Sequence, residues 1–286
     1  MNTTTFSLPY FRESIFRLKE NRAAMVGLWL LIFLFIAAII APFFTPYNYY
    51  EPHLSLKNYP PSKEFWFGTD ELGRNVFSRI WLGARISLFV GISAAFIDMI
   101  IGVIYGAFAG FIGGKMDEMM MRFCDILNSL PQLLIVIILL VLIGPGLTTI
   151  ILALTLTGWI NMARIIRGHI HQIKHLDFVM AAKALGASRF RILTHHLITN
   201  AVGSIITTVT LTIPGAIFTE SFLSFLGLGV QAPMASWGTM ASDGLPALRF
   251  YPWRLFFPAF FISITMFAFN LLGDGLRDAF DPRLRR

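Results

Sequence analysis

The chain has 286 residues, of which 56% are hydrophobic and only 14% are charged, and its formal net charge is +7. Soluble domains carry roughly 25% charged residues, so this composition and a mean hydropathy of +0.67 exclude an ordinary soluble domain and favour membrane spans. The single cysteine, Cys124, excludes an internal disulfide framework and a multi-cysteine metal site.

The first charge-free stretch predicts a membrane span over residues 24–44. In the preceding segment, residues 1–23, Phe11, Ile15 and Leu18 recur at helical spacing, which favours an interfacial helix; a frayed polar tail is the alternative. A cleaved signal peptide is not expected, because the apolar run starts late, is long and lacks an A-x-A site.

An outer loop is predicted over residues 45–85. Thr69 and Asp70 are expected to cap an amphipathic helix that runs through Arg74 and Trp81 and packs on the bundle or on a partner.

The core of residues 86–273 holds the remaining spans. The second covers Ile86–Gly114 and is interrupted only by Asp98. The run from Ile126 to Ala163 has no charge and would reach about 57 Å as one helix, far more than the ~30 Å hydrocarbon core.

Gly144-Pro145-Gly146 divides that run, so we expect a hairpin with helices over 126–143 and 147–163. Two further spans are predicted over Leu197–Thr219 and Leu255–Gly273, followed by a tail of residues 274–286.

Residues 164–196 form a long polar loop between spans and hold six of the basic residues. Asp177 is expected to cap a short helix that begins at Phe178, Gly186 to supply a left-handed stop, and Ser188 to cap a second helix. The residues alone do not decide between a docking element and a solvated connector.

Lys and Arg predict the orientation of an all-α protein with six spans. With the N-terminus in the cytoplasm, the inside segments hold 16 basic residues and the outside segments hold 7. This bias predicts both termini inside. Nucleic-acid binding is not expected, because the basic residues are scattered over several loops.

The polar loop carries a family resemblance. Met180-Ala181-Ala182, then Gly186, then Leu197-Ile198 resembles the E-A-A, Gly, I-x-L-P signature of binding-protein-dependent ABC importer permeases. Met180 stands where that signature often has Glu, and Thr199 stands where Pro is usual.

Further segments are similar to peptide-permease subunits. They are residues 67–74, 83–88, 121–129, 162–168, 220–229 and 273–278. Their order along the chain resembles the C-type subunit of the oligopeptide/dipeptide permeases, with the oligopeptide type nearest.

The resemblance implies the MetI-like fold of type I importers, in the bacterial inner membrane and in contact with lipid. It implies a B-type permease partner, two ABC ATPases that hold ATP and Mg, and an extracytoplasmic peptide-binding protein; this chain would bind no cofactor and be no enzyme. The residues implied to contact the ATPases are Asp177, Phe178, Met180, Ala181, Ala182, Leu185 and Gly186.

Two carboxylates are candidate pathway residues. Asp98 lies near the centre of a span, where a charge is costly, so it either lines the peptide path or is a buried packing residue. Glu220 either contacts cargo or braces the segment that follows it.

Other sites are not expected. His171 and His175 alone share one helical face, too few donors for a metal site. Gly110–Lys115 lacks the spacing of a phosphate-binding P-loop.

Two other classes of function remain as alternatives. A stand-alone secondary transporter or channel would need several ionisable residues inside the membrane. A membrane-embedded hydrolase would need a catalytic constellation within the spans, and the sequence places every histidine in or beside a loop.

Overall fold

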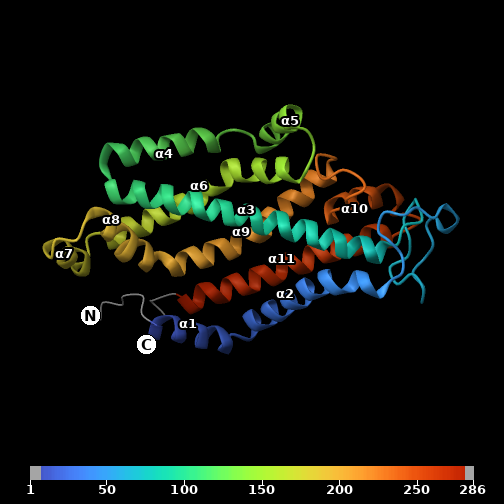
Figure 1. Cartoon of the computed structure of the whole chain (residues 1–286), viewed down its shortest axis with the longest axis horizontal. Coiled ribbons are helices and arrows are strands. Elements are labelled where there is room, and N and C mark those ends of the chain that lie inside the picture. The colour runs from blue at the N-terminus through green and yellow to red at the C-terminus, as the bar shows by residue number, and fades with distance from the viewer. Residues whose placement is uncertain (1–7, 281–286) are drawn as a thin grey trace.

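The computed structural model describes residues 8–280 as an elongated bundle of helices (Figure 1). The long helices are α2 (Arg22–Ile40), α3 (Val76–Ile112), α6 (Leu147–Ile173), α9 (Thr199–Phe225) and α11 (Trp253–Phe280). The shorter helices are α1 (Leu8–Glu20), α4 (Gly114–Asn128), α5 (Gln132–Ile143), α7 (Asp177–Ala184), α8 (Arg189–Arg191) and α10 (Trp237–Gly244). Single turns are η1 (Ala41–Phe44), η2 (Leu54–Leu56) and η4 (Leu245–Ala247), and η3 (Ile192–Ile198) is a π-helical segment.

Within residues 8–280, five helical stretches are long and apolar enough to cross a membrane. A sixth candidate is the pair α4 and α5, which is bent by 76°. The predicted straight helix over 126–143 is therefore wrong. Pro131 explains the break, because it lacks an N–H and disfavours helical backbone in the residue before it. The predicted turn at residues 144–146 is confirmed, since it separates α5 from α6.

The predicted outer helix is also wrong. The Asn75 side chain, which accepts hydrogen bonds from the backbone N–H groups of Phe77 and Ser78, caps a helix that begins at Val76 and runs without interruption into the second span. The Asp70 carboxylate instead accepts from the N–H groups of Leu72 and Arg74, which closes a loop turn before the helix.

Several helices extend past their predicted ends. Helix α6 continues to Ile173, α9 to Phe225 and α11 to Phe280. Each predicted end lay just before a charged residue, which is Arg164, Glu220 or Asp274, whereas the helices continue through these residues. Part of the predicted tail, residues 274–280, belongs to α11; residues 1–7 and 281–286 lie outside the described part of the chain. The helix favoured for the segment before the first span is present as α1, which ends at Glu20; its place at a membrane interface stays a prediction.

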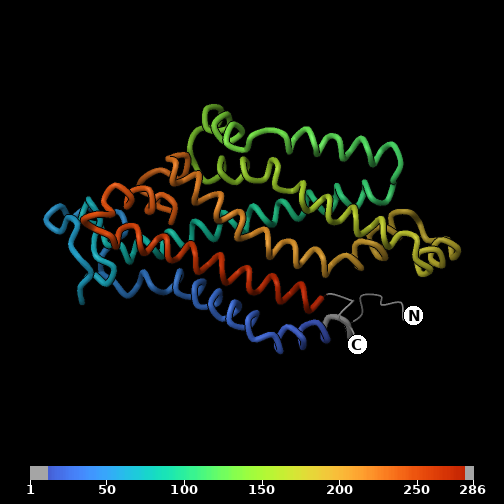
Figure 2. Tube along the Cα trace, turned by 180° about the vertical axis from the view of Figure 1, so that it is seen from behind, coloured from blue at the N-terminus to red at the C-terminus, as the bar shows by residue number. Residues whose placement is uncertain are grey.

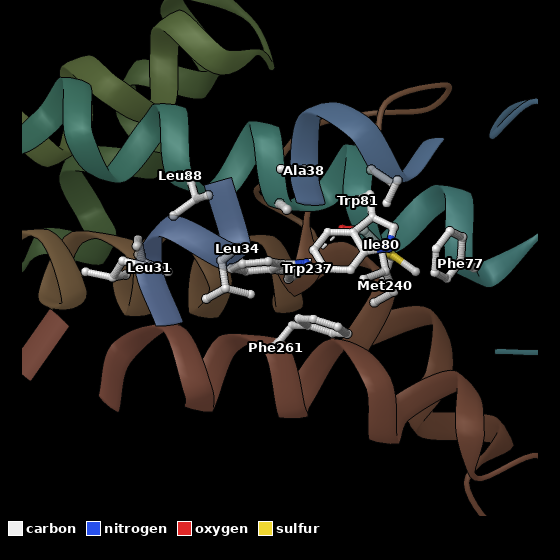
Figure 3. Packing of buried hydrophobic residues seen from close by; sticks show 14 of the residues in the cluster. Leu31, Leu34, Ala38, Phe77, Ile80, Trp81, Leu88, Trp237, Met240 and Phe261 are labelled. Atoms are coloured by element: carbon white, nitrogen blue, oxygen red, sulfur yellow. Dashed lines mark hydrogen bonds between the residues drawn. The ribbon is translucent and has the colours of Figure 1, made fainter. Parts of the chain in front are cut away.

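Apolar packing joins α2 and α11 to the centre of the bundle. Helix α11 packs against both α2 and α9, and α3 packs along α6. The core of α2, α3, α10 and α11 is centred on Trp237, whose indole N–H donates to the Ile80 carbonyl oxygen at 3.0 Å (Figure 3). Phe261 stacks on Trp237 with ring centroids 6.2 Å apart.

The bundle has two distinct ends. Helices α7 and α8 project at one end, here called the α7 end, and the start of α1 and the finish of α11 lie toward it (Figures 1 and 2). The loop of residues 45–75 and helix α10 lie at the opposite end, here called the α10 end. The polar loop and both ends of the described chain therefore share one side of the bundle.

Candidate functional site

The α7 unit, residues 177–198, comprises α7, a turn, α8 and η3. Val179 and Ala182 are buried on the inner face of α7, in or beside a core that includes Ile192 and Leu197 of η3. This packing fixes α7 on the end of the bundle, so its outer face is held in a defined position.

The outer face of the α7 unit carries large apolar side chains among exposed charges, which are those of Asp177, Lys183, Arg189 and Arg191. Met180 is 55% exposed, Leu185 88% and Phe190 74%. Ala181 is also exposed, but Ala182 faces inward, so only one of the two alanines offers a small outward surface. Exposed apolar side chains on a rigid helix end are typical of a protein interface.

The turn after α7 has the geometry that the sequence predicted. Gly186 has φ of +81°, and its N–H donates to the Lys183 carbonyl oxygen while that of Ala187 donates to Ala182. Such a left-handed residue closes a helix at its C-terminus, and glycine adopts it without strain. The Ser188 hydroxyl accepts from the N–H of Arg191 at 3.2 Å, as predicted.

The predicted capping by Asp177 is wrong. Leu176 is the N-cap and makes no side-chain hydrogen bond, while Asp177 is the first residue of the helix. An acid in the first turn still interacts favourably with the helix dipole. Phe178 is half-buried and lies beside the His196 ring, with centroids 6.5 Å apart.

An ion-paired clamp holds the base of the α7 unit. The buried Asp117 carboxylate of α4 accepts two hydrogen bonds from Arg167 of α6, at 2.5 and 2.7 Å, and lies 3.1 Å from His171 Nε2. Lys174 Nζ donates to the Gly110 carbonyl oxygen near the end of α3 at 2.8 Å. The clamp joins α3, α4 and the last turns of α6, which lead directly into α7.

Asp98 of α3 lines a cavity of about 370 Å³ between α3, α5, α6 and α9. It is 5% exposed, its Oδ1 is buried without a hydrogen-bond partner, and no ion pair to it is found within residues 8–280. Gly158 of α6 makes room for it, since a Cβ there would lie 2.2 Å from Oδ2.

Glu220 of α9 is fully buried and is surrounded by hydroxyls. Its carboxylate accepts from Ser87 of α3 at 2.9 Å, from Ser224 at 2.7 Å and from Ser221 at 3.4 Å. The Ser87 hydroxyl in turn accepts from the N–H of Trp237 in α10 at 3.4 Å. This arrangement matches the bracing alternative, because it links three helices and leaves no face of Glu220 exposed.

A cluster of ion pairs at the α10 end escaped the sequence analysis. The buried Asp70 carboxylate accepts from Arg74 Nε at 2.7 Å and pairs with Arg79. Burial alone would raise the pKa of Asp70, but the charges of Arg79 and Arg74 outweigh it and hold that pKa below its ordinary value. Arg254 pairs with Glu71 at 2.9 Å and so connects the loop to α11.

The structural roles of Asp117, Arg167 and Asp70 were not predicted from the sequence. Asp117 and Arg167 are 50 positions apart, and no local pattern marks two such residues as partners. Asp70 did stand out as a capping residue, and the error lay in the element that it was expected to cap.

Two models of known protein families match parts of this chain. A family model described as "Binding-protein-dependent transport system inner membrane component" matches residues 102–286. A second, described as "N-terminal TM domain of oligopeptide transport permease C", matches residues 9–61.

Named relatives cover almost the whole chain. The dipeptide transport system permease protein DppC of Bacillus subtilis is 60% identical over 98% of this chain and 88% of its own length. The oligopeptide transport system permease protein OppC of the same organism is 58% identical over 98% of this chain and 92% of its own length.

A solved structure shares the fold. An inward-facing conformation of the MetNI methionine ABC transporter matches with a TM-score of 0.59 and 17% identity, over 70% of this chain and 97% of that one. The predicted MetI-like helical architecture is thereby confirmed. The chain belongs to the family of binding-protein-dependent transport system inner membrane components.

Proposed function

We propose that this chain is the C-type permease subunit of an ATP-driven peptide importer. The observation that carries the proposal is its near full-length identity of 60% and 58% to relatives named as dipeptide and oligopeptide permeases. The two values are so close that they support peptides as the substrate class and favour neither length.

The proposed complex has a B-type permease beside this chain, two ABC ATPases below it and a peptide-binding protein outside. ATP and Mg would bind to the ATPases. The exposed apolar side chains of Met180, Leu185 and Phe190 in the α7 unit support docking at this end of the bundle. Residues 164–196 and both termini would lie in the cytoplasm of a bacterial cell. The excess of basic residues in these segments favours this orientation.

The proposed mechanism is alternating access. When the ATPases close on ATP, they move α7, and the clamp of Asp117 with Arg167 carries that movement into α4 and α6. The spans then reorient so that the cavity opens outward, and hydrolysis restores the inward-facing state. Asp98 lies on the pathway in this account, and Glu220 braces the helices beside it.

Co-purification and uptake test the proposal together. Tagged chain expressed with its partner subunits should retain two ATPases and a second permease, and the assembly should import peptides in an ATP-dependent manner. A chain that purifies without ATPases and still moves peptides would be a stand-alone transporter, and the proposal would be wrong. No feature of the described residues favours that alternative.

The docking role has a sharper test at Gly186. Gly186→Val should strain the left-handed turn, at a cost of about 1–2 kcal/mol, and misplace α7 while the spans remain inserted. Peptide-stimulated ATPase activity should fall. Gly186→Asn is the matched control, since asparagine tolerates this backbone conformation, and it should retain most activity. If Gly186→Val were as active as the wild type, the docking site would lie elsewhere.

A further inference from the structure

The side chains that line the cavity beside Asp98 carry only negative charge. Its polar lining includes Gln132 of α5, Asn161 of α6, and Thr208 and Thr212 of α9, and Asp98 is the one ionisable side chain among the residues that line it. The cavity is therefore a chamber with a single carboxylate and no cation to balance it.

The carboxylate has no partner within the described chain. Asp98 is only 5% exposed, and its buried Oδ1 accepts no hydrogen bond. The close approach of Gly158 leaves no room for a side chain that could pair with it from that position. An uncompensated carboxylate at such a depth is costly, so a donor from outside the chain would stabilise it.

The neutral groups of the cavity are suited to the same ligand. The Thr212 hydroxyl donates its hydrogen to the Thr208 carbonyl oxygen at 2.8 Å, which leaves its lone pairs as acceptors. Asn161 and Gln132 add amide oxygens that can accept as well. These oxygens can accept hydrogen bonds from a positively charged donor held at the carboxylate, although the amides also carry N–H donors.

The size of the cavity selects among such donors. A metal ion is not favoured, because Asp98 is the one carboxylate among the residues that line the cavity and the described residues hold no group of three or more His, Cys, Asp or Glu side chains that could bind a metal. A proton needs no cavity. An ammonium group attached to a larger molecule satisfies both the charge and the volume.

We propose that this cavity receives a primary ammonium group of the carried peptide, with Asp98 as its counter-ion. The proposal rests on the proposed function and adds the chemical group that the pathway recognises. The ammonium could be the amino terminus or a lysine side chain, and the test separates the two.

The test measures binding to the assembled complex of both permeases and both ATPases in nanodiscs, without nucleotide and without the binding protein. The probes are Ala-Ala-Ala, its N-acetyl form, and N-acetyl-Ala-Lys-Ala. Asp98→Asn keeps the shape and removes the charge. Asp125→Asn is the matched control, because Asp125 is an exposed carboxylate paired with Arg164 outside the cavity.

We expect Ala-Ala-Ala to bind at least about tenfold more tightly than its N-acetyl form, as for one charge-assisted hydrogen bond. Asp98→Asn should abolish that difference and Asp125→Asn should preserve it. Tight binding of N-acetyl-Ala-Lys-Ala would assign the site to any primary ammonium, and weak binding would assign it to the amino terminus.

Other outcomes overturn the proposal. They are equal binding of the free and acetylated peptides, an unchanged preference in Asp98→Asn, displacement of the peptide by sodium or potassium alone, or no saturable binding at all. Uptake by the wild-type complex, measured in parallel with the binding protein present, separates these failures from failure of the proposed function. A complex that imports peptides while showing any of these results retains its function and loses the ammonium site.

Discussion

Asp98 and Glu220 are two carboxylates buried in the helices, and their surroundings differ completely. Glu220 accepts hydrogen bonds from Ser87, Ser221 and Ser224. It is not among the residues that line the cavity beside Asp98. Asp98 has an unpaired oxygen and faces a cavity. Burial alone therefore does not assign a role to a charged residue in a span; its partners do.

The largest effect is expected at Glu220. Glu220→Ala would leave the hydroxyls of Ser87 and Ser224 without their acceptor and open a void, which should cost about 3–5 kcal/mol of stability. Glu220→Gln keeps the shape and one acceptor oxygen and should cost much less. Thermal melting of the purified complex measures both, and an unchanged melting temperature in Glu220→Ala would remove the contrast with Asp98.

Asp70 extends the comparison to a carboxylate that is paired with cations. Asp70→Asn would leave Arg74 without its counter-charge and Arg79 with only the more distant Asp243, at 3.6 Å, and this should cost about 2–4 kcal/mol. Because the folded pKa of Asp70 is lowered, its contribution is complete above the unfolded pKa, about 3.9, and is lost as pH falls through the folded value.

The pH dependence checks that sign. The difference in melting temperature between the wild type and Asp70→Asn should be constant from about pH 8 to 5 and should shrink below about pH 4. A difference that grew on acidification would mean that the carboxylate is not stabilised in its charged form.

A smaller effect is expected at Gly158. Gly158→Ala would push a Cβ against Asp98 Oδ2, and overpacking of this kind costs about 1–3 kcal/mol. Asp98→Ala should relieve the clash, so the double variant should be more stable than Gly158→Ala alone. If the changes in stability caused by Gly158→Ala and Asp98→Ala simply added in the double variant, the carboxylate would not lie against Gly158.

The smallest effect on stability is expected for Asp98→Asn. No partner in the described chain is lost, so the melting temperature should change by less than the equivalent of about 1 kcal/mol, while peptide uptake falls. Destabilisation as large as that of Glu220→Ala would make Asp98 a structural residue and would erase the comparison.

The sequence predicted the parts of the molecule that local patterns determine. Charge-free runs located the spans, and Gly186 marked a turn that has φ of +81°. The bend between α4 and α5 was not predicted, although Pro131 lies at it and is a local signal for a break in a helix. The start of α3 at Val76, capped by Asn75, was not predicted because Thr69 and Asp70 also have side chains that can cap a helix.

Contacts distant in sequence could not be predicted. Ser87 and Glu220 are 133 positions apart, and Asp117 and Arg167 are 50 apart. The sequence therefore posed the question of whether Asp98 and Glu220 line a pathway. The packing of α3 against α6 and α9 places them in different surroundings.

Cross-linking at Leu185 tests most directly whether α7 docks on an ATPase. Leu185 is 88% exposed at the α7 end, and the native Cys124 is buried, so Leu185→Cys introduces an accessible thiol. With a thiol-to-amine cross-linker, this variant should link to an ATPase subunit in the assembled complex. The control Gln231→Cys, exposed in the loop before α10, should not. A transport-competent complex in which Leu185→Cys never links to an ATPase would contradict the account.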